Sequence, residues 1–98
     1  MAANDYHVVV YQILAYMYRC LKDGTEINLH SIEKFKEDSG INERYWEYIW
    51  THLYKSKLVE DWCSNCCITP LGINYLMENS SMKAVWRFII ENDLPRLA

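Results

Sequence analysis

Residues 58–76, LVEDWCSNCCITPLGINYL, decide the fold. Two stretches typical of strands, Leu58 to Trp62 and Cys66 to Thr69, flank the polar pair Ser64-Asn65. This pattern predicts a β-hairpin with a short turn. Thr69-Pro70 then predicts a helix start, because threonine caps free backbone amides and proline at the first helical position gives up only a donor that has no partner there. We therefore expect a hairpin that leads directly into a helix.

Three helices are expected before the hairpin. Apolar residues recur at helical spacing from Tyr6 to Leu21, and Asp23-Gly24 ends this first helix. A short strand is predicted at Glu26 to Leu29, and Ser31 to Lys36 has the spacing of a brief second helix. The third helix is predicted from its N-cap Asn42 to about Lys55.

Two helices are expected after the hairpin. The helix that starts at Pro70 is predicted to end near Asn79, where Ser80 or Ser81 caps a fifth helix. One apolar face of that last helix is predicted to carry Met82, Val85, Trp86, Ile89 and Ile90. Asp93-Leu94-Pro95 is expected to end the fold. Because no repeat, low-complexity segment or linker divides the chain, we expect a single domain over residues 1–98.

Composition narrows the class of protein. The chain of 98 residues is 51% hydrophobic and 14% aromatic, which is typical of one globular domain with its own core. Ten Lys and Arg against 13 Asp and Glu give a formal charge of −3, so the chain is not a basic domain of the kind that binds nucleic acid by charge alone. No signal peptide or membrane span is evident, and a cytoplasmic protein is expected.

The order of predicted elements indicates the fold class. A helix, a short strand, two helices, a hairpin and a further helix follow one another as in a winged helix-turn-helix domain. The chain is thus expected to be mainly α, with about five helices and a small β-hairpin as the wing. In this fold the third helix is the element that can enter a DNA groove.

Three stretches carry a resemblance to a known family: YQILAY at 11–16, INERYW at 41–46 and ITPLGINYLMENS at 68–80, with Met82-Lys83 after the last. In them the chain resembles the YjcQ-type family of small winged-helix proteins from Gram-positive bacteria and their phages. The resemblance covers nearly the whole chain and implies a winged-helix fold and a phage or prophage setting. It implies no activity and no catalytic residues, and the cysteine-rich hairpin departs from the family's pattern.

The outer side of the third helix and the lysines around it carry the candidate DNA contacts. The candidates for contact with phosphates or base edges are Arg44, Tyr48, Thr51, Lys55, Lys57, Lys34 and Lys36. Glu43 and Glu47 lie in the first turns of the same helix, where they would repel phosphate. The first function hypothesis is therefore a DNA-binding accessory or regulatory protein that contacts duplex DNA, and the alternative interpretation of these residues is a solvated helix face of mixed charge.

The second function hypothesis is a protein-protein interaction module, either a homodimer or a binder of a host protein, without DNA binding. The first helix has a second apolar stripe away from its core side, and the last helix is aromatic. The candidate interface residues are Val8, Tyr11, Ala15, Tyr18, Trp86 and Ile90. Because the first and last helices flank winged-helix domains and commonly build the dimer, we expect a homodimer.

The predicted hairpin contains three of the chain's four cysteines. Cys63 and Cys66 have the CxxC spacing of a zinc knuckle, but a structural zinc site needs four ligands and no second CxxC or HxxxH exists to supply them. Residues that face each other across a two-residue turn also suit a disulfide poorly. Ordinary reduced cysteines are expected, with no metal and no cofactor.

No catalytic constellation is evident in the sequence. The three histidines His7, His30 and His52 are scattered, and no serine or cysteine lies at a recognisable nucleophile turn. Glu60-Asp61 are adjacent on a predicted strand and point to opposite faces. Without a glycine-rich phosphate loop, nucleotide hydrolysis is not expected either. The sequence therefore predicts a protein that is not an enzyme and has no small-molecule substrate.

Overall fold

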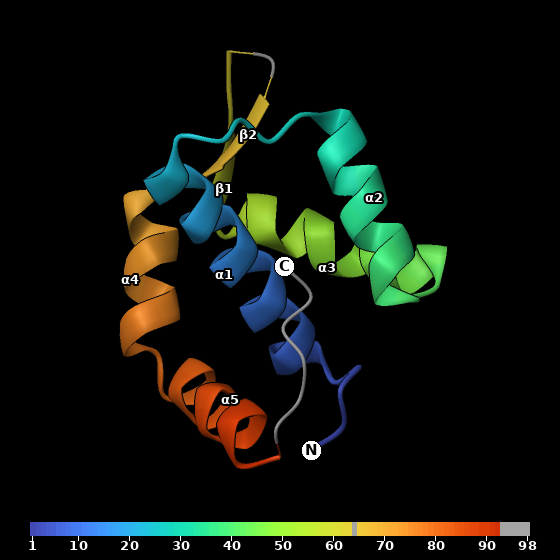
Figure 1. Ribbon diagram of the computed structural model, residues 1–98, viewed down its shortest axis with the longest axis vertical. Helices are drawn as coiled ribbons and strands as arrows, with labels where there is room; N and C mark the ends of the chain where they lie inside the picture. The colour runs from blue at the N-terminus through green and yellow to red at the C-terminus, as the bar shows by residue number, and fades with distance from the viewer. Residues whose placement is uncertain (64, 93–98) are drawn as a thin grey trace.

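The computed structural model describes residues 1–63 and 65–92, which form five α-helices and one two-stranded antiparallel sheet (Figure 1). In chain order the elements are α1 (Tyr6–Asp23), α2 (Leu29–Ser39), α3 (Glu43–Lys55), β1 (Val59–Trp62), β2 (Asn65–Ile68), α4 (Pro70–Glu78) and α5 (Ser80–Glu91). The prediction of a mainly helical chain with a small hairpin is confirmed. The expected end of the fold at Asp93-Leu94-Pro95 lies outside the described residues.

α1 is the central helix, with α4 and α5 along one side and α2 and α3 along the other (Figure 1). A helix that packs on more than one side must be apolar over most of its circumference. The buried residues of α1 are Val8, Val9, Val10, Tyr11, Gln12, Ile13, Leu14, Met17 and Cys20. The predicted outward-facing stripe on this helix is therefore wrong at two positions, because Val8 and Tyr11 are only 1% and 8% exposed and belong to the chain's own core.

α2 begins earlier and ends later than predicted because its ends are capped. The Asn28 side chain accepts a hydrogen bond from the Ser31 amide at 2.9 Å, and Gly40 closes the helix in the left-handed conformation. Since Asn28 caps the helix, the chain leaves the extended conformation at once. Of the strand predicted from Glu26 to Leu29, only the single bridge between Ile27 and Cys66 forms.

α3 forms as predicted, from the N-cap Asn42, whose side chain accepts from the Tyr45 amide at 2.9 Å. Its inward side buries Trp46, Ile49 and Leu53, as the helical spacing indicates. Trp46 also stacks on Trp50, with 5.7 Å between ring centroids. α3 is thus fixed to the core along one side, and its other side is left to solvent.

The hairpin turn lies one residue earlier than predicted, which shifts the pairing of the two strands by two residues. A turn at Ser64-Asn65 would place Ile68 opposite Asp61, whereas the structure pairs Val59 with Ile68 and Trp62 with Asn65. Both Val59 and Ile68 are buried, so the observed register sets two apolar side chains opposite each other at the base of the hairpin. Asn65 consequently belongs to β2 rather than to the turn, and Ser64 lies outside the described residues.

α4 and α5 are short helices that meet at one residue. The Thr69 hydroxyl accepts from the Gly72 amide at 2.9 Å, which confirms the predicted start at Pro70. The N-cap of α5 is Asn79 rather than either predicted serine, because its carboxamide oxygen accepts from the amides of Ser81 and Met82. The abrupt change of direction places both helices against α1 (Figure 1).

The apolar face predicted for α5 divides into a buried row and an exposed row. Met82, Val85 and Ile89 are in the core, while Trp86 and Ile90 are 47% and 51% exposed. Residues four apart lie one turn along the helix, so Trp86 and Ile90 form their own short row beside the buried one. The exposed row is available for contact with another molecule.

Candidate functional site

The outer side of α3 brings together four of the predicted DNA contacts. Arg44, Tyr48, Thr51 and Lys55 are all exposed, as predicted. Tyr48 lies against His52, with ring centroids 4.3 Å apart, and meets the Tyr6 ring edge-on at 6.4 Å. The surface is accessible, and its ability to bind DNA depends on the charges around it.

The lysines on α2 are already paired with carboxylates. The Lys36 ammonium lies 3.0 Å from carboxylate oxygens of both Glu33 and Glu43, its side chain is only 14% exposed, and these hydrogen bonds raise its pKa. Lys34 lies 4.0 Å from Asp38. The contact between Lys36 and Glu43 joins two helices, so no spacing within one helix indicates it. The geometry leaves Lys36 little freedom to reach a phosphate.

The hairpin beside α3 is acidic. Glu60 and Asp61 are exposed on β1, and the described residues of the two strands include no Lys or Arg. The Tyr54 hydroxyl donates a hydrogen bond to Asp61 at 2.7 Å, which ties α3 to the hairpin. Burial, and then this hydrogen bond, raise the pKa of Tyr54. Together with the exposed Glu47, these carboxylates make the α3 side of the molecule mixed in charge rather than basic.

All four cysteines line one cavity of about 440 Å³ between the C-terminal end of α1 and the hairpin. Cys20 is buried, and Cys66 is half-buried with its thiol 3.5 Å from the carbonyl oxygen of Ile27. Burial, followed by the nearby Asp61, raises the pKa of Cys66 to about 11. With this pKa, Cys66 is a protonated thiol at neutral pH. Cys63, by contrast, is exposed at the end of the hairpin, with a positive φ of 47°.

The zinc interpretation of the hairpin gains no further ligand from the fold. Within residues 1–63 and 65–92, no three side chains of His, Cys, Asp or Glu lie together in a way that could hold a metal ion. Cys66 pairs with Asp61 across the sheet, and so Cys63 and Cys66 do not face each other as the predicted register implied. His52 is already engaged, with its Nδ1 2.7 Å from the carbonyl oxygen of Tyr48.

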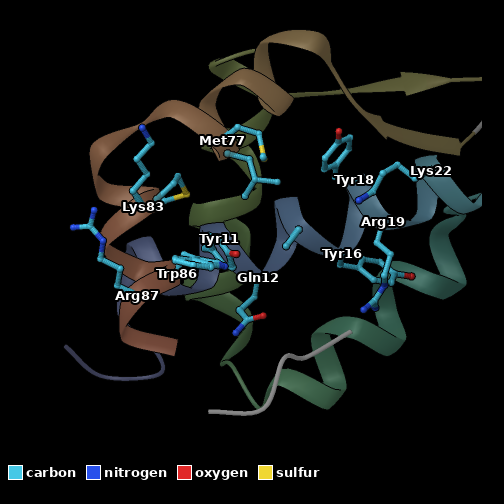
Figure 2. Close-up of a pocket in the computed structure, with 13 residues that line it drawn as sticks. Tyr11, Gln12, Tyr16, Tyr18, Arg19, Lys22, Met77, Lys83, Trp86 and Arg87 are labelled. Carbon is cyan, nitrogen blue, oxygen red and sulfur yellow. The ribbon is translucent and has the colours of Figure 1, made fainter. Parts of the chain in front are cut away.

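A groove lies on the other side of the molecule, between α1, α4 and α5 (Figure 2). We call it the α1–α4–α5 groove; its volume is about 590 Å³. The residues that line it are Tyr11, Gln12, Ala15, Tyr16, Tyr18, Arg19, Lys22, Leu76, Met77, Met82, Lys83, Trp86 and Arg87. Its apolar floor comes from aliphatic, thioether and aromatic side chains of all three helices, and Trp86 and Met77 are about half exposed.

The charges of this groove have one sign. Arg19 and Lys22 from α1 lie on one side, and Lys83 and Arg87 from α5 lie on the other (Figure 2). These are four of the chain's ten basic residues, and none of the described lining residues is acidic. In a protein of formal charge −3, the groove is therefore a local concentration of positive charge.

Two of the four cations make contacts at the edge of the groove. The Lys22 ammonium lies 4.5 Å from the centroid of the Tyr18 ring. The Lys83 ammonium lies 3.5 Å from Glu78, with both side chains more than half exposed. Contacts of this exposed kind are weak and exchange readily, since water competes for both partners.

The predicted interface residues are only partly brought together. Trp86, Tyr11, Ala15 and Tyr18 line the α1–α4–α5 groove, whereas Val8 is in the core and Ile90 lies outside the groove lining. Sequence reasoning missed Lys83 and Arg87, which recur four residues apart on the aromatic helix, and Arg19 and Lys22, which recur three apart on α1. Those spacings indicate paired cations on one side of a helix.

Comparison of the chain with known protein families, with curated proteins and with solved structures finds no match. The resemblance to the YjcQ-type family therefore stays a prediction. Among the described residues, no helix has the length and apolar character needed to cross a bilayer.

Proposed function

We propose that this protein is a non-enzymatic binding module of the winged helix-turn-helix class, and that its principal partner is another protein. Support for the class comes from the order of elements: α2 and α3 are followed directly by the hairpin, and the bridge at Ile27 stands where the fold has its first short strand. The resemblance to YjcQ-type proteins supports the same class and a phage or prophage setting.

The observation that carries the proposed protein partner is the exposed apolar surface of α4 and α5. Leu71, Met77, Trp86 and Ile90 are each about half exposed, and Met77 and Trp86 also line the α1–α4–α5 groove. Aromatic residues and methionine are enriched where proteins meet, and groups of exposed apolar side chains mark such surfaces. On α3 itself, within the part of the chain that the structure describes, Tyr48 is the single exposed large hydrophobic side chain.

A different protein fits this surface better than a second copy of the chain. In a two-fold dimer a surface patch faces a copy of itself. Contact through the α1–α4–α5 groove would then bring four cations against four cations, and like charges opposed across an interface weaken it. We therefore expect light scattering to give the monomer mass of 11.7 kDa at micromolar concentration. A dimer that persists in Trp86→Ala would place the self-contact elsewhere.

The proposed function is tested by partner capture followed by reconstitution. A tagged protein is used to purify partners from its source cells, and the partner is then mixed, purified, with three forms of the protein. We expect binding by the wild type, loss of binding with Trp86→Ser plus Ile90→Ser, and retention with Arg44→Ala plus Lys55→Ala. The opposite pattern, with loss only in the α3 variant, contradicts the proposal.

DNA binding through α3 is the second candidate function. Arg44, Thr51 and Lys55 are all exposed on one side of α3, which favours this function. α3 is the second helix of the pair α2–turn–α3, the position of the recognition helix in a helix-turn-helix domain. Random duplex DNA titrated at two salt concentrations tests it, because phosphate contacts release counterions and binding must weaken steeply as salt rises. If this candidate is right, Arg44→Ala plus Lys55→Ala weakens the low-salt binding, and absence of binding at low salt eliminates it.

A further inference from the structure

The α1–α4–α5 groove has an apolar floor between two rims, and each rim carries a pair of cations. Arg19 and Lys22 are three residues apart on α1, and Lys83 and Arg87 are four apart on α5. Both spacings correspond to about one helical turn, roughly 4.5–6 Å along the helix axis. The exposed apolar surface of the groove includes Met77 from α4 and Trp86 from α5, each about half exposed. The groove is therefore a strip of apolar surface bordered on both sides by positive charge.

We propose that this groove binds an acidic amphipathic helix of a partner protein. The inference rests on the proposed function and adds the chemistry of the partner. An amphipathic helix places apolar residues at i, i+3, i+4 and i+7 on one face, which is the shape that an apolar groove between helices accepts. Glu or Asp side chains on both flanks of that face then reach the two rims.

Charge complementarity favours an acidic helix over an uncharged one. A neutral helix would bury its apolar face on the floor and would offer no carboxylate to the cations of the two rims. Carboxylates placed one turn apart on each flank match the spacing of these pairs. The contact between Lys83 and Glu78 shows that a carboxylate reaches this rim, and because that pair is exposed, exchange for a partner's carboxylate costs little.

A small anion and a nucleic acid fit the groove less well. A small anion requires cations that converge on one point, whereas these cations come from two helices on opposite sides of the groove (Figure 2). Single-stranded nucleic acid requires several open aromatic surfaces for base stacking. Here Tyr11 is buried, Tyr16 already stacks on Phe35 with 4.8 Å between ring centroids, and Tyr18 is only partly exposed. Trp86 alone presents a half-exposed ring, so aliphatic side chains suit the floor better than bases.

Two matched peptides test the inference by fluorescence anisotropy. The first is a capped, labelled peptide of about 18 residues, long enough to form a helix, with a Leu stripe flanked by Glu on both sides and Ala elsewhere. The second has Gln at every Glu position. Both are titrated with the full-length wild type and with Arg19→Glu, Arg87→Glu, Trp86→Ala and the control Lys55→Glu, which makes the same charge change at an exposed position on α3. Circular dichroism verifies the fold of each variant.

We expect the Glu peptide to bind the wild type about tenfold more tightly than the Gln peptide, and to lose that advantage as salt rises. Arg19→Glu and Arg87→Glu should each weaken the Glu peptide about fivefold, and Lys55→Glu should leave it within about twofold. Trp86→Ala should weaken both peptides.

Five results overturn the inference. Equal binding of the two peptides with dependence on Trp86 means that the groove accepts proteins without selecting acidic ones, so the proposed function stands and the acidic partner fails. Binding of neither peptide, or equal weakening by Lys55→Glu, removes the groove as an acidic-helix site. Tighter binding of oligo(dT) than of the Glu peptide assigns the groove to nucleic acid. Loss of a wild-type dimer in Trp86→Ala assigns it to a second copy of the chain.

Discussion

Gly72 is a single residue on which the packing of α4 depends. A Cβ atom at this position would collide with the carbonyl oxygen of Leu58 and lie 2.8 Å from Cγ1 of Ile68. Leu58 precedes the hairpin and Ile68 ends it, so the missing side chain lets α4 pack directly against the base of the two strands. Real Cβ atoms do not approach backbone this closely, and a larger residue must displace the helix.

Gly72→Ala is therefore expected to lower the free energy of unfolding by about 3 kcal/mol, since the collision is with backbone and a flexible side chain cannot relieve it. Urea denaturation followed by circular dichroism measures the change. Asn74→Ala, an exposed change in the same helix, is the control and should alter stability by less than about 0.5 kcal/mol. Equal stability of Gly72→Ala and the wild type would refute the close contact between α4 and Leu58.

Cys66 gives a prediction about pH. Burial, followed by the nearby Asp61, raises the pKa of its thiol from 9.0 to about 11, so the folded protein keeps this proton while the unfolded chain loses it. Between pH 9 and pH 11 the unfolded state binds fewer protons than the folded state, so the free energy of unfolding falls as pH rises. Below pH 9 the contribution of Cys66 to stability is fully present.

The measurement is the rate of iodoacetamide alkylation of Cys66, followed by mass spectrometry of its peptide. In the folded protein this rate should rise about tenfold per pH unit from pH 8 and level off near pH 11, because only the thiolate reacts. The same cysteine in urea should level off near pH 9. A plateau near pH 9 in the folded protein would show that the thiol is not shielded as described.

Among the elements, the helices were the most predictable and the hairpin register the least. Asn42 and Thr69 are side-chain caps whose effect is local, so both helix starts follow directly from the sequence. The register of the hairpin depends instead on which residues the core buries. Val59 and Ile68 pair because both reach the core, and that preference outweighs the turn-forming character of Asn65.

In α5, too, the sequence pattern did not show which apolar residues the core buries. The neighbours Ile89 and Ile90 both fit the predicted apolar face, yet one is 3% and the other 51% exposed. We expect Ile89→Ala to lower the free energy of unfolding by about 3 kcal/mol and Ile90→Ala by about 1 kcal/mol, because the second side chain buries half as much surface and leaves no cavity. Thermal and urea unfolding of the matched pair measure the difference. Similar losses would place Ile90 in the core and remove it from the exposed row.

In the whole molecule, the α1–α4–α5 groove could not be predicted from the sequence because it joins positions far apart in the chain. Arg19 and Lys22 lie about 60 residues before Lys83 and Arg87, and nothing local relates them. Their one-turn spacings were visible, and so was the aromatic character of α5. What only the fold supplies is the crossing of α1 with α4 and α5, which turns two cationic rows into the two rims of one groove (Figure 2).

The fold also redistributes the charges that the sequence suggested for DNA binding. Lys36 lies between Glu33 and Glu43, and the hairpin adds Glu60 and Asp61 near α3. A net charge of −3 thus divides into a mixed surface around α3 and a positive groove on the opposite side of α1. This division is the physical reason to assign binding to the groove rather than to the helix that the fold class favours.

The assignment of binding to the α1–α4–α5 groove is tested most directly by NMR. Uniformly ¹⁵N-labelled protein is titrated with the Glu peptide described above, and the change in each amide shift is mapped onto the fold. We predict that the largest changes fall on α1 around Arg19 and Lys22, on α4 around Met77 and on α5 from Lys83 to Arg87. Changes concentrated on α3 or on the hairpin, with the groove amides unmoved, would contradict it.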